Sequence, residues 1–316
     1  MKKYLILAIS LSLVCTACTK SQRGKWAFKR GNYQRAIELF EQVIATDLSN
    51  PTAQTYLPLA KSGMLTDEAA RAINAGRMEE AVRLLDEAQA LDPKNTDAKT
   101  LMQKAIESLA LSIVNTLMPA KKWEEVVPVA DIIIKHQPGR NALYGVKAEA
   151  LFHAAKETYT SRNILAIQKA AGLLPGDAFL QARMQEISTR SPAFKNAFFA
   201  YLKALDSKNI GAWKGLLHPQ YLTDVNADIK RFVQNEDPEI KDIGSFFKEL
   251  CIDHEKNCGG EAVKIVCIEP LSGEHAFVHF MYKNTPKVMK IEMIKTGGSL
   301  KLYREEDSEL RLDEVE

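Results

Sequence analysis

Two stretches of the sequence decide the fold: GNYQRAIELF at residues 31–40 and GRMEEAVRLL at residues 76–85. The second stretch lies 45 residues after the first and has the same pattern. Glycine matches glycine, alanine matches alanine, and both stretches end in a large apolar residue. The same shift relates further positions: Asp47, Asn50 and Ala53 fall on Asp92, Asn95 and Ala98, and a third unit follows through Trp123, Val126, Ala130 and Ile133. Internal periods of 20 to 50 residues are typical of solenoids built from stacked supersecondary units.

The residues within a unit resemble tetratricopeptide (TPR) repeats, in which a tight turn joins two antiparallel helices. The resemblance implies that Gly31 and Gly76 lie in the turn, where a side chain would crowd the helix crossing. It also implies that Ala81 is small so that the first helix can approach closely, while Leu85 fills the space beside it. Pro93 would block continuation of the second helix.

TPR repeats have a period of 34 residues, so a period of 45 leaves eleven extra residues in each unit. These lie mainly within 52–75 and 97–120, which are the first helices of the second and third units. Eleven residues make nearly three whole helical turns, so a lengthened helix keeps its apolar face within about 20° of its former direction. Pro58 and Gly63 could break the first of these helices into two pieces. The other has an apolar line at i+4 spacing: Leu101, Ala105, Leu109, Ile113 and Leu117.

A fourth unit begins near Asn141, and a last helix over 177–187 is expected to cap the stack. We therefore expect an all-α helical solenoid over residues 18–190. Stacked repeats form a surface lined by their first helices, which generally holds peptides or helices of other proteins. The apolar stripes are predicted to be core, and the polar positions expected to contact a partner include Gln103, Glu107 and Lys147.

Residues 191–303 predict an α+β domain, because helical periodicity after Ser191-Pro192 gives way to alternating strands from residue 263. The order of elements resembles the nuclear-transport-factor-2-like (NTF2-like) cone fold. In that superfamily a curved sheet wraps a long helix and leaves a pocket at its open end. The resemblance implies a pocket near the following residues, most of which could equally be core: Trp213, Tyr221, Phe277, His279 and Tyr282.

The terminal domain holds carboxylates and histidines but no enzyme motif. Some enzymes of the NTF2-like fold use an Asp with a His or Tyr across the pocket. A spacing of four residues places His275 and His279 on one face of a strand. No nucleophile elbow, phosphate loop or paired-carboxylate motif is present, so we predict a protein without catalytic residues, cofactor or metal. The available carboxylates are Asp206, Asp224 and Asp228.

The cysteines allow two interpretations. Cys251 and Cys258 enclose a short polar segment, and in an oxidising compartment we expect a disulfide between them. The alternative is a zinc site from these two cysteines and His254, although a second group of ligands is missing. Cys267 lies on a predicted strand and is expected to be a buried thiol, with pairing to either cysteine left open.

The first 17 residues have the order of a secretory signal, with Lys2 and Lys3 followed by an apolar run and small residues. The run is too short to span a bilayer comfortably. Thr16-Ala17-Cys18 resembles the lipobox of bacterial lipoproteins, with Cys15 where the family usually has Leu, Val or Ile. The resemblance implies a lipid anchor at Cys18, and Thr19 implies outer-membrane retention. Ordinary signal cleavage before Cys18 is the alternative.

Removal of residues 1–17 leaves equal numbers of basic and acidic residues, which argues against a nucleic-acid binder or a polybasic membrane reader. The acidic tail over 304–316 is expected to be solvated and poorly ordered. We therefore expect a non-catalytic scaffold or adaptor for another envelope protein or peptide, lipid-anchored at the periplasmic face of the outer membrane. Assembly of the outer membrane, of pili or of secretion machinery is a process in which such an adaptor would act. The alternative is a small-ligand-binding or enzymatic terminal domain recruited by the repeats, and the oligomeric state is open.

Overall fold

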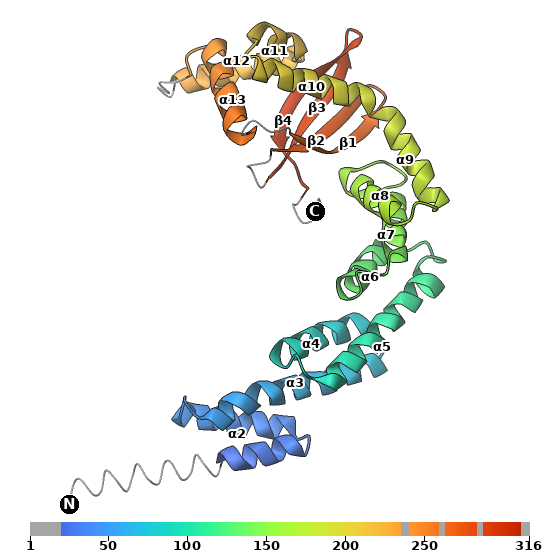
Figure 1. Cartoon of the computed structure of the whole chain (residues 1–316), viewed down its shortest axis with the longest axis vertical. Coiled ribbons are helices and arrows are strands. Elements are labelled where there is room, and N and C mark those ends of the chain that lie inside the picture. The colour runs from blue at the N-terminus through green and yellow to red at the C-terminus, as the bar shows by residue number, and fades with distance from the viewer. Residues whose placement is uncertain (1–19, 235–239, 259–262, 283–286, 311–316) are drawn as a thin grey trace, which may run out of the picture. The chain divides into compact units, whose positions relative to one another are not determined.

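A computed structural model describes residues 20–234, 240–258, 263–282 and 287–310 (Figure 1). The expected signal segment and Cys18 lie outside these ranges. The chain divides into two compact units, one of residues 1–122 with 131–137 and the other of residues 123–130 with 138–316. The expected boundary after residue 190 lies inside the second of these units. Among the described residues, none of the helices combines the length and apolar character needed to cross a membrane.

The first unit consists of the helical hairpins that the 45-residue repeat predicts. Residues 20–29 are helical and precede α2 (Tyr33–Thr46), α3 (Pro51–Asn74), α4 (Met78–Leu91) and α5 (Thr96–Ser112). A π-helical turn, η1 (Ile113–Leu117), extends α5, and α6 (Trp123–His136) is shared between the two units. The eleven extra residues thus lengthen the first helices, as expected. The expected break at Pro58 and Gly63 is wrong, because α3 is continuous.

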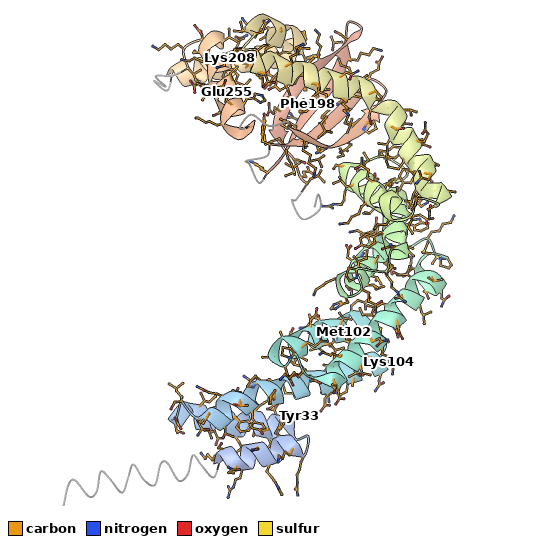
Figure 2. The ribbon with its side chains drawn as sticks, viewed as in Figure 1. Tyr33, Met102, Lys104, Phe198, Lys208 and Glu255 are labelled. Atoms are coloured by element: carbon orange, nitrogen blue, oxygen red, sulfur yellow. The ribbon has the colours of Figure 1, made fainter. Side chains whose placement is uncertain are left out.

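Tyr33 lies on α2 (Figure 2), and glycine is required at position 63 where α3 passes its ring. A Cβ atom at Gly63 would lie only 2.5 Å from Tyr33 Cε1, closer than real Cβ contacts come. Gly24 has the same relation to Phe40, whose Cε1 atom would lie 2.7 Å from an added Cβ. The residues that permit close approach of the helices therefore lie inside the first helices.

The turn glycines have a different role from the one that the family resemblance implied. Gly31 and Gly76 both have a φ of +76°, and an added Cβ would meet nothing within 4 Å at either position. Glycine is thus needed there for the left-handed backbone rather than to avoid crowding at the crossing. In the third unit, Lys121 adopts the same backbone region with a φ of 55°.

A buried polar network joins α3 to α4 and to the start of α5. The Ser62 hydroxyl donates to the Ala88 carbonyl at 2.8 Å. The Asn95 amide donates to Ser62 Oγ at 2.9 Å and to Thr66 Oγ1 at 3.0 Å. Asn95 and its repeat counterpart Asn50 also cap their helices, each accepting the backbone N–H three residues on. Only Asn95 therefore combines the cap with buried hydroxyl partners.

The second unit contains the fourth hairpin, five further helices and a four-stranded antiparallel sheet in the order β1-β2-β3-β4, counted over the described residues. Its helices are α7 (Ala142–Ala154), α8 (Ser161–Leu173), the expected capping helix α9 (Ala178–Arg190), α10 (Pro192–Asp206), α11 (Ile210–Leu216), α12 (Pro219–Gln234) and α13 (Ile243–Cys258). Its strands are β1 (Lys264–Ser272), β2 (His275–Met281), β3 (Val288–Thr296) and β4 (Ser299–Asp307). Helices followed by hairpin strands were predicted, whereas α12 was not.

The strand β4 corrects the expected tail. Residues 304–307 continue the sheet, with Arg304 opposite Glu292 on β3. Leu310 is buried against the helices of the fourth hairpin. The expected disordered segment over 304–316 therefore begins too early, and residues 311–316 lie outside the described ranges.

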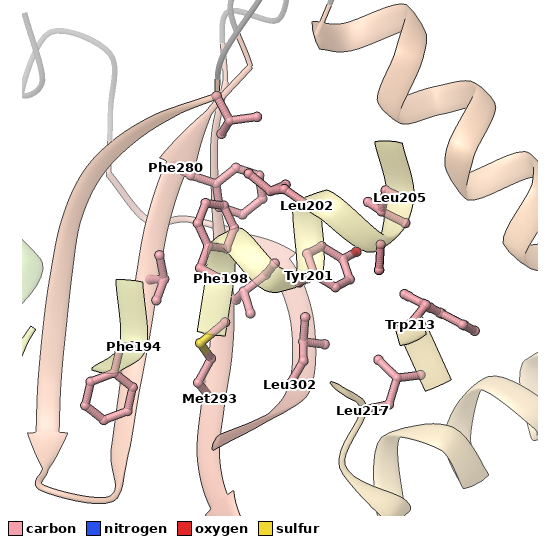
Figure 3. Close-up of a cluster of buried hydrophobic side chains, with 14 of the residues drawn as sticks. Phe194, Phe198, Tyr201, Leu202, Leu205, Trp213, Leu217, Phe280, Met293 and Leu302 are labelled. Carbon is pink, nitrogen blue, oxygen red and sulfur yellow. The ribbon is translucent and has the colours of Figure 1, made fainter. Parts of the chain in front are cut away.

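The two faces of the sheet pack against different helices. On one face Phe280, Met293 and Leu302 meet the aromatic side of α10, where Phe198 lies 4.9 Å from Phe280 between ring centroids (Figure 3). On the other face Cys267 belongs to a cluster with side chains of α7, α8 and α9. The repeats thus end against the sheet, which explains why the fourth hairpin belongs to the second unit.

The expected loop between Cys251 and Cys258 is helical, because α13 continues to Cys258. Seven residues of helix rise about 10 Å, whereas the Cα atoms of a disulfide lie within about 7 Å. The expected Cys251–Cys258 disulfide does not fit this helix, and Cys251 is a buried free thiol. Cys267 is the buried thiol that the sequence predicted. For the zinc alternative, His254 Nε2 lies 2.8 Å from Asp206 Oδ1, and the side chain of Cys258 lies outside the part of the chain that the structure describes.

We predict that Asn95→Asp lowers the free energy of unfolding by about 1 to 3 kcal/mol, because Asp retains the cap but cannot donate to Ser62 and Thr66. Asn50→Asp is the matched control, since it changes the same repeat position without buried hydroxyl partners, and its effect should be smaller than about 1 kcal/mol. Urea denaturation followed by circular dichroism measures both. Equal effects of the two substitutions would contradict the network.

Candidate functional site

A cleft of 390 Å³ in the second unit lies between the start of α8 and the sheet face on which α8 packs. Its walls are formed by residues 160–162, Glu269 of β1, Phe277 and His279 of β2, Lys290 of β3, and residues 309–310 after β4. The Lys290 ammonium lies 5.0 Å from the centroid of the Phe277 ring. The cleft therefore combines an aromatic ring with charged groups of both signs.

His279 is the centre of a hydrogen-bond network in this cleft and is only 3% exposed. Its Nδ1 atom lies 2.8 Å from Ser308 Oγ, and its Nε2 atom lies 3.3 Å from Glu269 Oε2. With the proton on Nε2, His279 donates to Glu269 and accepts the Ser308 hydroxyl. Ser308 Oγ in turn accepts the Leu310 N–H at 3.1 Å.

The start of α8 provides the other end of the network. The first N–H groups of a helix have no partner within the helix, and the positive end of its dipole favours a negative charge. Thr160 and Asn163 form a capping box that satisfies part of this demand. The Ser161 N–H donates to Glu269 Oε2 at 2.9 Å. A carboxylate of the chain itself therefore occupies the position that an anion would take.

The surroundings of Glu269 keep it ionised. Burial alone would raise the pKa of Glu269, but the hydrogen bonds from His279 and Ser161 outweigh burial and lower it below its ordinary value. Two residues earlier on β1, burial raises the pKa of the Cys267 thiol, and the charge of Glu269 raises it further. Cys267 therefore stays a neutral thiol, and the negative charge stays on Glu269.

Serine, histidine and carboxylate follow one another here in the order of a nucleophile relay. Glu269 is nevertheless engaged by the helix N–H, and Ser308 by a backbone N–H in addition to the histidine. The bonds join α8, the sheet and the segment after β4, which are far apart in the sequence. These hydrogen bonds hold the fourth hairpin on the sheet. We call the four residues that form them, Ser161, Glu269, His279 and Ser308, the brace.

The five residues expected around one pocket lie on both faces of the sheet. Phe277 and His279 line the α8 cleft, whereas Tyr282 packs in the α10 core because neighbouring residues of a strand alternate between faces. Trp213 is fully buried in that core, and Tyr221 packs against it. The expected single pocket is therefore wrong, and a second hollow of 450 Å³ between α10 and α11 contains none of the five residues.

The described contacts do not join the two histidines of β2 to the aspartates that an enzymatic alternative would use. His275 and His279 share a strand face as predicted, but their carboxylate partners are Glu292, with a contact of 2.8 Å, and Glu269. Asp206 contacts His254 instead. The other two aspartates lie at the surface of α12, with Asp224 accepting from Gln220 and Asp228 paired with Arg231.

Sequence reasoning missed Glu305, which it assigned to the tail. Glu305 lies on the α10 side of β4, and its Oε2 atom accepts the Tyr201 hydroxyl at 3.1 Å. Burial raises the pKa of Glu305, although the bond from Tyr201 opposes the rise. Burial also raises the pKa of Tyr201 and Tyr221, and the charge of Glu305 adds to both shifts. Burial therefore makes ionisation of Glu305 less favourable than it is in water.

The first unit offers a surface of a different kind on α5 and η1. Gln103 and Glu107 are exposed as expected, and the Gln103 amide donates to Glu107 Oε1 at 3.1 Å. Helical spacing continues the same stripe to Leu111 and Val114, which are 61% and 62% exposed. We call these four residues the α5 stripe. Lys147, the third expected contact residue, lies half-buried on α7 in the second unit.

The orientation of α5 explains this stripe. Ala105, Leu109, Ile113 and Leu117 are buried as their i+4 spacing predicts. Met102 is buried as well, whereas Lys104, two residues on, is exposed (Figure 2). Leu111 and Val114 were missed by sequence reasoning, although their spacing from Gln103 was a signal that could have identified them.

A comparison with family models agrees with the helical hairpins. Residues 27–105 match the family model described as tetratricopeptide repeat, so TPR-like repeats form this part of the chain. Among solved structures, MamA AMB-1 is 19% identical, with a TM-score of 0.21, over 57% of this chain and 89% of that chain. MamA 41-end from Desulfovibrio magneticus RS-1 is 16% identical, with a TM-score of 0.18, over 55% and 88%. No curated protein matches the chain significantly.

We predict that Glu269→Gln lowers the free energy of unfolding at neutral pH by about 1.5 to 3 kcal/mol, the range for hydrogen bonds to charged groups. Gln can still accept the Ser161 N–H, but it lacks the charge that His279 and the helix start stabilise. Glu274→Gln, in the exposed turn before β2, is the control and should have little effect.

The pH dependence of this effect has a definite sign. The pKa of Glu269 is lower in the folded than in the unfolded state, so its stabilising contribution is full above the unfolded pKa, about 4.3. That contribution is lost as the pH falls through the folded pKa, and the stabilities of wild type and Glu269→Gln should converge in acid. Parallel stability curves, measured by denaturation over this pH range, would contradict the brace.

Proposed function

We propose that this protein is a non-catalytic scaffold that binds another protein through the α5 stripe. The single observation that supports this function best is the exposure of Leu111 and Val114 on a repeat helix whose other apolar residues are buried or half-buried. TPR-like repeats leave the polar side of their first helices available to partners. Two large apolar side chains on that side add contact area that the fold itself does not use.

The stripe has the composition of a site for a helix or an extended peptide. Gln103 and Glu107 supply hydrogen-bonding groups at one end, and Leu111 and Val114 supply apolar contact at the other. The π-helical turn η1 includes Val114, and the Met118 N–H donates to the Ile113 carbonyl at 3.0 Å. π-Helical turns are rare and occur frequently at functional sites.

We propose further that the protein is an envelope lipoprotein anchored through Cys18 at the periplasmic face of the outer membrane. The basic, apolar and small residues of positions 1–18 support this location. The partner would then be another envelope protein or peptide, in outer-membrane, pilus or secretion machinery. The terminal domain is proposed to be NTF2-like because a helix packs on one face of a four-stranded meander. Through the brace, its proposed role is to hold the fourth hairpin in place.

A second candidate function is binding of a small ligand in the α8 cleft. Its volume of 390 Å³ falls within the usual range of ligand pockets, about 300 to 1,000 Å³. Phe277 would provide a stacking face, and Lys290 and Glu309 would provide charges of opposite sign. Thermal shift assays with zwitterionic metabolites test it: a ligand whose stabilisation disappears in Phe277→Ala supports this function, and an undiminished shift contradicts it.

We predict that a photoreactive amino acid at position 111 or 114 captures a protein partner in cells. The same amino acid at position 83, exposed on α4, is the control and should not form that adduct. Once the partner is identified and purified, Leu111→Glu should weaken its binding by about 2 kcal/mol or more, as expected for a central apolar contact. Identical adducts from positions 83 and 111, or unchanged affinity of Leu111→Glu, would contradict the stripe.

We also predict that Cys18→Ser moves the protein from the membrane fraction to the soluble fraction after a wash in high salt. The wash matters because it releases protein that is held by charge alone, whereas acyl chains resist it. Immunoblotting of washed membranes gives the distribution. Retention of the variant in washed membranes would end the lipoprotein proposal.

A further inference from the structure

The helix over residues 20–29 and the residue that follows it carry a high density of positive charge. Residues 20–30 contain five of the chain's 42 basic residues and none of its 40 acidic ones: Lys20, Arg23, Lys25, Lys29 and Arg30. Trp26 lies among them and is 60% exposed, although tryptophan is a large side chain that folding usually buries. The near-neutral composition of the whole chain conceals this local cluster.

The basic and aromatic residues are gathered on one side of the helix. At about 100° per residue, Arg23, Lys29 and Arg30 all fall within about 60° of the direction of Trp26. All four side chains are exposed, and we call them the Trp26 face. The opposite side of the helix does the packing, since Gly24 meets Phe40 there. Among the described residues, the Trp26 face is therefore left exposed.

The groups of the Trp26 face are arranged together. The Arg30 guanidinium carbon lies 3.4 Å from the centroid of the Trp26 ring, so the cation covers the indole. The first helix of a repeat stack normally presents a polar outer side, because no earlier repeat covers it. An indole at the centre of this side departs from that rule and indicates that another surface contacts it.

We propose that the Trp26 face binds the surface of an anionic phospholipid bilayer. Tryptophan is enriched at the level of the lipid headgroups, where its ring is half apolar and its N–H can hydrogen-bond. Arginine and lysine are attracted by anionic headgroups, and helices with a basic and aromatic face lie in the plane of the interface. The complete absence of acidic residues from 20–30 matches a negatively charged surface rather than a mixed protein interface.

This contact goes beyond the proposed function, because it needs neither an acyl chain nor the α5 stripe. It would nevertheless act with the anchor. Cys18 lies two positions before Lys20, the first described residue of this helix, so an acyl chain at Cys18 would hold the Trp26 face within reach of the headgroups. Linked contacts of this kind strengthen each other through effective concentration.

The test uses residues 18–316 with Cys18→Ser, which keeps every described residue and removes the acylation site. Its binding is measured by sedimentation with vesicles of phosphatidylglycerol and phosphatidylcholine, and with vesicles of phosphatidylcholine alone. We expect binding to the anionic vesicles only, with a strong dependence on salt. The combined change Arg23→Gln, Lys29→Gln and Arg30→Gln should weaken it roughly a hundredfold, at about fivefold for each charge.

Matched variants separate a specific face from general charge. Lys94→Gln, Lys99→Gln and Lys104→Gln together remove three exposed lysines from α5 and the loop before it, and this protein should bind almost as wild type does. Trp26→Ala should weaken binding. Leu48→Ala changes a residue that is 78% exposed in the loop between α2 and α3, and it should not weaken binding. Circular dichroism melting of each variant shows that the helices are still folded.

A fluorescence measurement places the indole itself. Brominated lipids in the anionic vesicles should quench part of the tryptophan emission, and Trp26→Phe should abolish that quenching. No binding to anionic vesicles, equal binding to phosphatidylcholine alone, or equal loss in both triple variants would overturn the proposal. Self-association that Trp26→Ala abolishes, seen by analytical ultracentrifugation without vesicles, would overturn it in favour of a face between copies. Failure of the α5 crosslinks would leave these vesicle results unchanged.

Discussion

The structure of the repeats depends on the close approach of neighbouring helices, and two glycines inside the first helices make that approach possible. At Gly24 and Gly63 an aromatic ring of α2 occupies the space that a side chain would need. The rings of Phe40 and Tyr33 are thereby held against the backbone of the helix before and the helix after α2. The faces of the helices that lie away from the packed core are left for other surfaces. The α5 stripe and the Trp26 face are two such positions.

The repeats end at the fourth hairpin, which packs against the sheet. The fourth hairpin resembles the earlier ones in its helices, but its second helix packs on the sheet instead of on a fifth hairpin. Glu269 joins the two by accepting from the start of α8 and from His279. The sheet therefore covers one side of the fourth hairpin, as a terminal element of a repeat stack is expected to do. The brace and the apolar core of α7 to α9 therefore belong to one structural unit.

The sequence predicted the features that repeat or alternate. The 45-residue shift located the hairpins and lengthened first helices, and alternation located the strands. It could not predict which sheet face α8 would cover, because that depends on contacts between distant residues such as Ser161 and Glu269. The cysteine pairing failed because polar residues between Cys251 and Cys258 suit a helix surface as well as a loop. Glu305 was missed because acidic composition at 304–316 concealed a strand that extends the sheet.

The contact between Tyr33 and Gly63 is the most direct test of the close approach on which the fold depends. A double-mutant cycle combines Gly63→Ala with Tyr33→Leu and measures the free energy of unfolding of all four proteins. The account predicts that Gly63→Ala destabilises the wild type but is tolerated once the ring is gone, with a coupling energy of about 1 kcal/mol or more. Strictly additive effects would show that the ring and the glycine do not meet, and would contradict the packing of the helical hairpins described above.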